Sequence, residues 1–324
     1  MHQLMRFPQS VVAALLVIGF ATGQADADSF GMDDVLVAEQ SGGTVRHYSA
    51  SGADLGAFAS GLSQPSWMTT DANGNVYVSE YTGTRVDKFS PSGALLLSIP
   101  TAFNPGDVRV ANDGTIYVAD YFGGNVYRYS ASGAPLGLFV ATGLSRADFM
   151  AFDASGNLYV TDFLSGAVRR ISPAGANLGN FLSGLPTSFP KGVEGIAFDS
   201  SGNLYAANNA TNTVEKYSPS GVALGTFASG LNDPYGLAFD SNGNLFVANY
   251  GNGTVREFSS SGTDLGNFVS VGLSSPRDLV IVATPEPSTG LLVLTLVIFG
   301  LVAVGWNRHK RKAAALHSES HSHA

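Results

Sequence analysis

The sequence predicts an all-β protein, a six-bladed β-propeller of four-stranded blades flanked by an N-terminal signal peptide and a C-terminal transmembrane helix. Three observations lead to this prediction. A segment recurs along the middle of the chain every 40 to 46 residues. Each copy holds four short strand patterns separated by Gly, Asn, Asp and Ser, and the two long uncharged apolar runs lie outside the copies.

The N-terminal segment has the features of an export signal. Arg6 precedes an apolar run at 11–20, and Ala25 and Ala27 occupy the two small-residue positions that a signal peptidase reads. The run is shorter than the roughly 20 residues that a membrane-spanning helix needs. We therefore expect residues 1–27 to be a cleaved signal peptide.

The repeat is clearest around its glycines. Those at positions 74, 114, 156, 202 and 243 follow one another at intervals of 40, 42, 46 and 41 residues, and a degenerate further copy begins at Asp33. In the last complete copy, 235–239, 244–248, 254–258 and 264–268 have the pattern of four short strands. A β-helix has a shorter period and a sandwich needs about 100 residues. Residues 28–284 are therefore predicted to form six blades.

The ends of the repeat region predict how the ring closes. The region starts with the second strand of a blade, at 35–38, and ends with an isolated first strand, at 277–282. Pairing of these two strands would complete the incomplete blade and remove two open strand edges. This arrangement is a three-plus-one closure.

The C-terminal segment contains a short motif, an apolar run and a basic cluster in that order. The run covers 290–306, and its length is at the short limit for a transmembrane helix. The basic cluster predicts a cytoplasmic tail and an exported remainder. The residues of the motif and the cluster are Pro285, Glu286, Pro287, Arg308, Lys310, Arg311 and Lys312.

This order resembles the PEP-CTERM sorting signal of Gram-negative bacteria, over residues 285–312. The resemblance implies export across the inner membrane, membrane anchoring before processing, and processing near Pro285 by an exosortase-type enzyme. It also implies a final place at the cell surface or outside the cell, with exopolysaccharide or a surface protein as a partner. The chain continues beyond the point where such signals usually stop, and residues 313–324 are predicted to be a disordered tail.

The repeat is similar to NHL repeats and, more loosely, to the propeller of streptogramin B lyases. In NHL-like blades the first strand lines the central channel, so the resemblance implies that residues near its start converge at one mouth. These residues are Ser66 and Trp67, Gly106 and Asp107, Asp148 and Phe149, Glu194 and Gly195, Tyr235 and Gly236, and Arg277 and Asp278.

We expect the carboxylates, aromatic rings and arginine of this set to form a ligand site. Asp107, Asp148, Glu194 and Asp278 could hold a divalent cation such as calcium, and the rings of Trp67, Phe149 and Tyr235 could stack on a sugar. The alternative is a set of solvated residues at strand starts, partly neutralised by Arg277.

Two further polar positions recur once per repeat. Turns such as 71–75, with Asp first and Gly fourth, superficially resemble calcium loops but lack the downstream Glu of an EF-hand, and so are predicted to be structural. The residues that end each second strand are predicted to bind backbone amides of the following turn. They are Glu39, Glu80, Asp120, Asp162, Asn208 and Asn249.

The composition favours binding over catalysis. The chain has no cysteine, and His47 is the one histidine between residues 28 and 284, whereas the streptogramin lyases rely on histidine chemistry. A metal-dependent hydrolase or lyase that uses the channel carboxylates is the alternative to a binding or structural module. The same region has 12 Lys and Arg against 22 Asp and Glu, and this acidic balance argues against nucleic acid as a partner.

Overall fold

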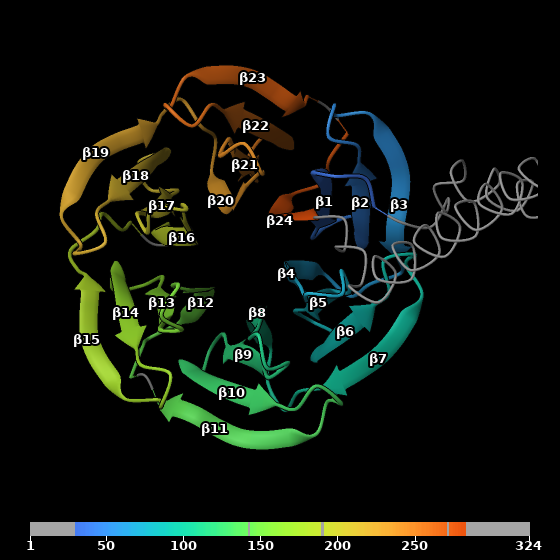
Figure 1. The fold of residues 1–324 in the computed structure, drawn as a ribbon, viewed down its shortest axis with the longest axis vertical. Helices are drawn as coiled ribbons and strands as arrows, with labels where there is room; N and C mark the ends of the chain where they lie inside the picture. Colours follow the sequence, from blue (N-terminus) through green and yellow to red (C-terminus); the bar gives the residue numbers. More distant parts are fainter. Residues whose placement is uncertain (1–29, 142, 189–190, 271, 283–324) are drawn as a thin grey trace, which may run out of the picture. The chain divides into compact units, whose positions relative to one another are not determined.

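The computed structural model describes residues 30–141, 143–188, 191–270 and 272–282, which form six four-stranded antiparallel sheets. Figure 1 shows these sheets as blades around a central axis, with one strand of each blade next to the axis and one at the circumference. The predicted six-bladed propeller is confirmed.

The strands of each blade are called inner, second, third and outer, according to their distance from the axis. Each of the four lists below gives its strands in the order of blades 1 to 6. The inner strands are β24 (Pro276–Val282), β4 (Pro65–Thr70), β8 (Pro105–Val110), β12 (Ala147–Phe152), β16 (Val193–Phe198) and β20 (Pro234–Phe239). The second strands are β1 (Asp34–Glu39), β5 (Val76–Glu80), β9 (Ile116–Asp120), β13 (Leu158–Asp162), β17 (Leu204–Asn208) and β21 (Leu245–Asn249). The third strands are β2 (Thr44–Tyr48), β6 (Arg85–Phe89), β10 (Asn125–Tyr129), β14 (Ala167–Ile171), β18 (Thr213–Tyr217) and β22 (Thr254–Phe258). The outer strands are β3 (Asp54–Ser60), β7 (Leu95–Pro100), β11 (Pro135–Ala141), β15 (Asn177–Leu182), β19 (Ala223–Ala228) and β23 (Asp264–Val269).

The ring closes through blade 1. Its inner strand β24 comes from the end of the repeat region and pairs antiparallel with β1, with Val35 opposite Ile281 and Val37 opposite Leu279. Figure 1 shows β24 beside β1 at the axis. The predicted three-plus-one closure is therefore confirmed.

The core lies between neighbouring blades. The second strands are buried almost throughout, because both of their faces are covered by adjacent blades. Tyr205 of β17 packs edge-to-face on Phe227 of its own blade and on Phe239 of the next, at centroid distances of 4.8 and 4.9 Å. Tyr159 makes the equivalent contacts in blade 4. Aromatic contacts repeated in this way hold successive blades together.

The turns between inner and second strands are structural, as predicted. Asp71 Oδ1 accepts hydrogen bonds from the backbone N–H groups of Asn73 and Asn75, both at 3.0 Å. Gly74 adopts a φ of 75°, which favours glycine. Equivalent Asp side chains close the turns of blades 4, 5 and 6.

The polar residues that end the second strands bind two kinds of backbone amide. Asp120 and Asn208 accept hydrogen bonds from the following turn, as predicted. Glu80 and Asn249 instead accept hydrogen bonds from Ser63 and Asn232, in the segment that leads into the inner strand of the same blade. The proximity of that segment was not evident from the local sequence.

The predicted targeting segments fall outside the described residues. These are the signal peptide at 1–27, the sorting motif with its apolar run at 285–312, and the tail at 313–324. Within the part of the chain that the structure describes, no helix is long and apolar enough to cross a membrane.

Candidate binding site at the central channel

The channel site begins with an irregularity at the start of every inner strand. In β12, Ala147 pairs with Asp162 and Met150 with Val160, so the regular pairing skips Asp148 and Phe149. The other five inner strands are interrupted at the equivalent place. A bulge suspends the strict alternation of side chains, and both skipped residues of β12 contact side chains that line the channel.

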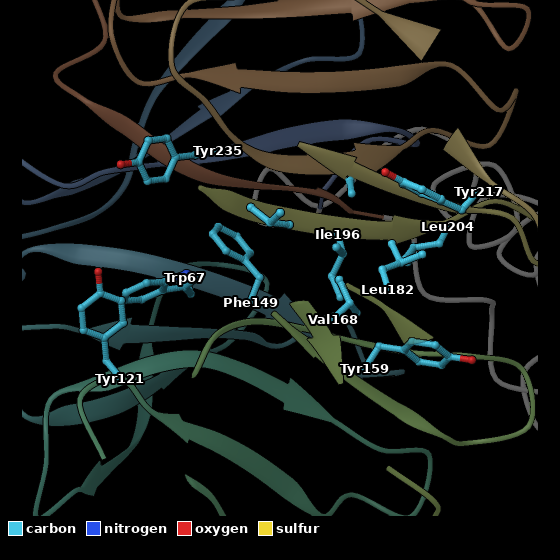
Figure 2. Packing of buried hydrophobic residues seen from close by; sticks show 12 residues of the cluster. Trp67, Tyr121, Phe149, Tyr159, Val168, Leu182, Ile196, Leu204, Tyr217 and Tyr235 are labelled. Atoms are coloured by element: carbon cyan, nitrogen blue, oxygen red, sulfur yellow. The ribbon is translucent and has the colours of Figure 1, made fainter. Parts of the chain in front are cut away.

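Five of the predicted residues meet where the inner strands begin, which we call the upper end of the channel. This upper cluster consists of Trp67, Asp148, Glu194, Tyr235 and Arg277. The Arg277 guanidinium carbon lies 4.6 Å from the ring centroid of Trp67 and 4.5 Å from that of Tyr235. Figure 2 shows the two rings, with Phe149 and Tyr121, gathered on one side of the core cluster.

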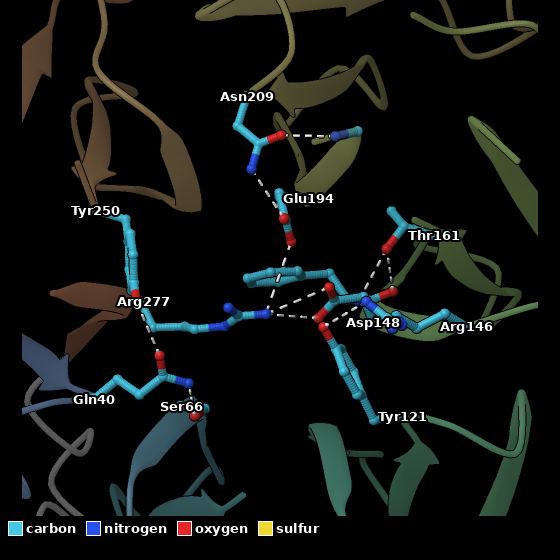
Figure 3. Close-up of polar contacts among 12 residues, drawn as sticks. Gln40, Ser66, Tyr121, Arg146, Asp148, Thr161, Glu194, Asn209, Tyr250 and Arg277 are labelled. Atoms are coloured by element: carbon cyan, nitrogen blue, oxygen red, sulfur yellow. Dashed lines mark hydrogen bonds and ion pairs between the residues drawn. The ribbon is translucent and has the colours of Figure 1, made fainter. Parts of the chain in front are cut away.

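The same guanidinium joins two acidic side chains from different blades. Arg277 Nη2 lies 3.4 Å from Asp148 Oδ2 and 3.9 Å from Glu194 Oε2 (Figure 3). Relative exposure is 0% for Asp148, 1% for Glu194 and 7% for Arg277. These side chains are therefore buried, and the alternative of a solvated set of strand ends does not describe them.

Burial sets the ionisation of the upper cluster. It raises the pKa of Asp148, and the nearby Arg277 limits that rise. For Glu194, burial and then the Asp148 carboxylate raise the pKa well above its ordinary value, which favours the protonated acid. Burial alone would lower the pKa of Arg277, but Asp148 and Glu194 raise it, so this arginine stays charged.

The hydrogen bonding of the upper cluster is incomplete. Among the described protein atoms, Trp67 Nε1, Arg277 Nε and Glu194 Oε2 are buried without a hydrogen-bond partner. A buried polar group without a partner costs about 1–3 kcal/mol. The cluster thus keeps two N–H donors, Trp67 Nε1 and Arg277 Nε, without an acceptor among the described protein atoms.

The remaining two predicted carboxylates lie in a separate lower cluster with Arg109. Arg109 Nη2 lies 2.7 Å from Asp107 Oδ2. Asp107 Oδ2 also accepts a hydrogen bond from Met150 N in blade 4, and Asp278 Oδ2 accepts one from Met68 N in blade 2. Burial raises the pKa of Asp278 to about 6. Both carboxylates therefore connect adjacent blades.

The predicted calcium site does not fit this arrangement. The four carboxylates are divided between two clusters, and each cluster already surrounds an arginine. A divalent cation would have to displace a buried guanidinium. Within the described ranges no group of three or more His, Cys, Asp or Glu side chains is placed to hold a metal ion.

Glycine occupies three of the predicted mouth positions, Gly106, Gly195 and Gly236, because neighbouring inner strands approach closely there. A Cβ atom on Gly195 would overlap the carbonyl oxygen of Tyr235, and one on Gly236 would overlap Asp278. Gly195 and Gly236 therefore allow close approach between the inner strands of blades 5 and 6 and between those of blades 6 and 1.

A ring of residues around the upper end was missed in the sequence. These rim residues each follow a second strand by one position, next to the recurring polar residue. Asn209 Nδ2 donates to Glu194 Oε1 at 3.1 Å, and the ring of Tyr250 lies 4.9 Å from that of Tyr235. Four of the six are aromatic, a signal that alignment of the repeats could have revealed. The rim residues are Gln40, Tyr81, Tyr121, Phe163, Asn209 and Tyr250.

The rim also presents an exposed aromatic side chain. Phe122 is 56% exposed, and its ring lies 5.1 Å from Tyr121. The Arg146 guanidinium carbon lies 4.8 Å from the Tyr121 ring and 5.4 Å from that of Phe122. An exposed ring beside a half-buried cation is a usual feature of binding surfaces.

The opposite, lower end of the channel is hollowed. A cavity of about 270 Å³ there is lined by Thr69, Arg109, Phe152, Phe239 and Ile281, among others. Arg109 was not predicted from the sequence, although it follows Asp107 by two residues, the spacing that places side chains on one side of a strand.

Comparisons with known proteins support the fold. Residues 231–258 match the NHL repeat family model. The chain is similar to a chain in the crystal structure of a nidogen/laminin complex, with a TM-score of 0.69, 18% identity, and 78% of this chain and 99% of that chain covered. It is also similar to a streptogramin B lyase, with a TM-score of 0.59, 13% identity, and 81% and 92% covered.

A putative gluconolactonase gives a TM-score of 0.59 at 15% identity, with 71% of this chain and 88% of that chain covered. Structural similarity at such low sequence identity supports the propeller fold and gives no information about activity. A comparison with curated protein sequences gave no match.

Proposed function

We propose that the protein is an exported propeller that acts as a binding module at the cell surface or in the envelope and takes its ligand at the upper end of the channel. The observation that carries this proposal is the aromatic rim, with Phe122 exposed, above a buried cluster of unused hydrogen-bonding groups. Aromatic side chains and arginine are enriched at binding surfaces.

The location rests on the two ends of the sequence. Residues 1–27 have the pattern of an export signal, and 285–312 that of a sorting signal processed by an exosortase-type enzyme at the inner membrane. Processing near Pro285 would cut after β24, which ends at Val282, and would leave all six blades intact. Exopolysaccharide and surface proteins are the partners that this location offers.

The structural neighbours are consistent with binding but do not decide it. One neighbour was solved in a nidogen/laminin complex, and another is a lyase. The same fold therefore serves both recognition and catalysis.

The geometry gives no support to the alternative of a metal-dependent hydrolase or lyase. The carboxylates that would hold the metal are engaged with Arg109 and Arg277. His47, the one histidine of residues 28–284, lies 2.8 Å from Asp34 on the third strand of blade 1 rather than at the channel.

The test compares two variants of the full chain that each replace an exposed apolar side chain by serine. Phe122→Ser changes the rim, and Leu265→Ser changes the outer strand of blade 6, where the leucine is 54% exposed. Both are screened against a glycan array and against purified surface proteins. We expect Phe122→Ser to weaken ligand binding at least tenfold and Leu265→Ser to leave it unchanged. Equal binding by both variants, or no ligand for the unmodified chain, would overturn the proposal.

A further inference from the structure

A second set of concave sites lies on the lower face, away from the rim. Three pockets open between consecutive blades, with volumes of about 410 Å³ between blades 2 and 3, 500 Å³ between blades 3 and 4, and 400 Å³ between blades 5 and 6. Such volumes lie within the usual range of small-ligand sites, about 300–1,000 Å³. We call them the turn-face pockets.

The three pockets are built from equivalent residues. Each contains the tyrosine of a second strand, namely Tyr77, Tyr117 or Tyr205. Each also contains the turn that follows the inner strand of the next blade. The repeat of the fold therefore presents the same kind of pocket three times on one face.

The two lysines of these pockets are already paired within the protein. Lys88 Nζ lies 3.1 Å from Asp71 and 4.9 Å from the ring centroid of Tyr77. Lys216 Nζ lies 3.5 Å from Asp199, in the equivalent position of blade 5. In the middle pocket, Asp153 accepts a hydrogen bond from Asn157 Nδ2 at 2.8 Å.

These partners keep the carboxylates of Asp71 and Asp199 ionised and hydrogen-bonded. Burial alone would raise the pKa of Asp71, but hydrogen bonds from Asn75 and Lys88 lower it below its ordinary value. The pKa of Asp199 is lowered in the same way, by Asn203 and Lys216, against the effect of burial. A charged ligand would have to compete with these partners.

Apart from Asp113, an exposed carboxylate in the middle pocket, the groups that remain available are uncharged. Exposed amide and hydroxyl side chains line the pockets, including Asn73, Asn112, Ser200, Ser201 and Asn242. Phe152 and Phe239 form partly buried apolar walls in two of the pockets. Neutral hydrogen-bonding groups beside an apolar wall match the hydroxyl groups and the apolar ring face of a sugar.

We propose that the turn-face pockets bind successive segments of one uncharged polysaccharide chain. A polymer with a repeating unit is the ligand that can occupy several equivalent pockets at once, and each further contact is then intramolecular. The inference rests on the proposed binding function but places the saccharide on the face opposite the rim.

The first experiment measures how affinity depends on chain length. The full chain, kept soluble in a detergent without a sugar head group, is titrated calorimetrically with α-glucan and β-glucan series from the disaccharide to long polymers. Alginate serves as the charged probe. We expect affinity per sugar unit to rise about tenfold or more from the disaccharide to the polymer of one series. Alginate is expected to bind more weakly than the neutral polymer.

The second experiment fills the pockets one by one. Ala131, Ala154 and Ser260 each line a different pocket at an exposed turn position, so phenylalanine there occupies the pocket without entering the core. Each single variant should lose part of the length-dependent gain, and the triple variant should bind the polymer no better than the disaccharide. Ser165→Phe, at an exposed turn on the upper side, is the matched control and should bind normally.

The outcomes separate this inference from the proposed function. If polymer binding survives the triple variant but is lost in Phe122→Ser, the upper end binds the ligand and the turn-face inference is wrong. Stronger binding of alginate, or equal binding of an extended peptide that is lost in the triple variant, would also overturn it. If no glycan or surface protein binds the unmodified chain at all, both proposals fail.

Discussion

Arg277 is the residue on which the upper cluster depends. It comes from the strand that closes the ring and makes contact with side chains of blades 2, 4, 5 and 6. The buried Asp148 carboxylate faces this guanidinium, so removal of Arg277 would leave that carboxylate without its nearest counter-charge.

We expect Arg277→Met to destabilise the propeller by about 3–5 kcal/mol, the usual cost of breaking a buried ion pair. The measurement is urea denaturation of residues 28–284, followed by the fluorescence of Trp67, the one tryptophan of that region. The control adds Asp148→Asn and Glu194→Gln to the same variant, so that no acid remains unpaired. If this triple variant is as unstable as Arg277→Met alone, packing rather than charge explains the loss.

At the scale of single residues, the sequence predicted which side chains reach the channel but not how they pair. Alignment of the repeats placed Asp148 first and Asp107 second in the pair of residues near the start of the inner strand, and assigned both acids to one mouth. The structure places Asp107 with Arg109 and Asp148 with Arg277. Asp148 is the first and Asp107 the second of the two residues that the strand pairing skips, and these consecutive positions serve different clusters.

The outer strands show how a strand edge is protected. Each carries an exposed leucine, and in blades 1, 3, 4, 5 and 6 the next residue is a glycine with a φ between 91° and 107°. Pairing with the third strand shifts register twice in these blades. Irregular edges of this kind hinder pairing with another chain. The leucines are Leu55, Leu96, Leu136, Leu178, Leu224 and Leu265.

The outer strand of blade 2 lacks this protection. β7 has Leu97 where the other blades have glycine, and its pairing with β6 shifts register only once. Leu95 and Leu96 are 57% and 54% exposed. A regular, exposed and apolar edge strand is an expected site of self-association.

We therefore expect Leu96→Lys to reduce concentration-dependent association of residues 28–284, because a charge on a regular edge opposes strand pairing. Leu136→Lys in blade 3 is the matched control, since Leu136 is 51% exposed on an irregular edge and its replacement should have little effect. Sedimentation velocity over a range of concentrations measures the difference. Equal effects of the two substitutions would mean that the shape of the edge is unimportant.

At the scale of the whole molecule, the sequence was most informative. The period of the repeat gave the number of blades, and the unmatched strands at its two ends gave the closure, because both follow from counting strands along the chain. The cavity at the lower end and the turn-face pockets could not be predicted, since each is formed by residues of neighbouring blades that are distant in sequence.

The closure can be tested directly, because the chain has no cysteine and an introduced pair can form only one intramolecular disulfide. Val35 and Ile281 are opposite each other in the β1–β24 pair. A disulfide between Val35→Cys and Ile281→Cys would close a loop that spans nearly the whole propeller. The loss of chain entropy in the unfolded state should stabilise the oxidised form by up to about 5 kcal/mol relative to the reduced form.

Urea denaturation of both forms measures this stabilisation. The control pair, Val35→Cys with Leu279→Cys, is displaced by two residues along β24 and should remain reduced under the same mild oxidation. Efficient oxidation of the control, or no stabilisation of the matched pair, would contradict the register at which the last strand completes the first blade. Because a single antiparallel pair of strands joins the two ends of the ring, this register decides whether all six blades close into one cooperative unit.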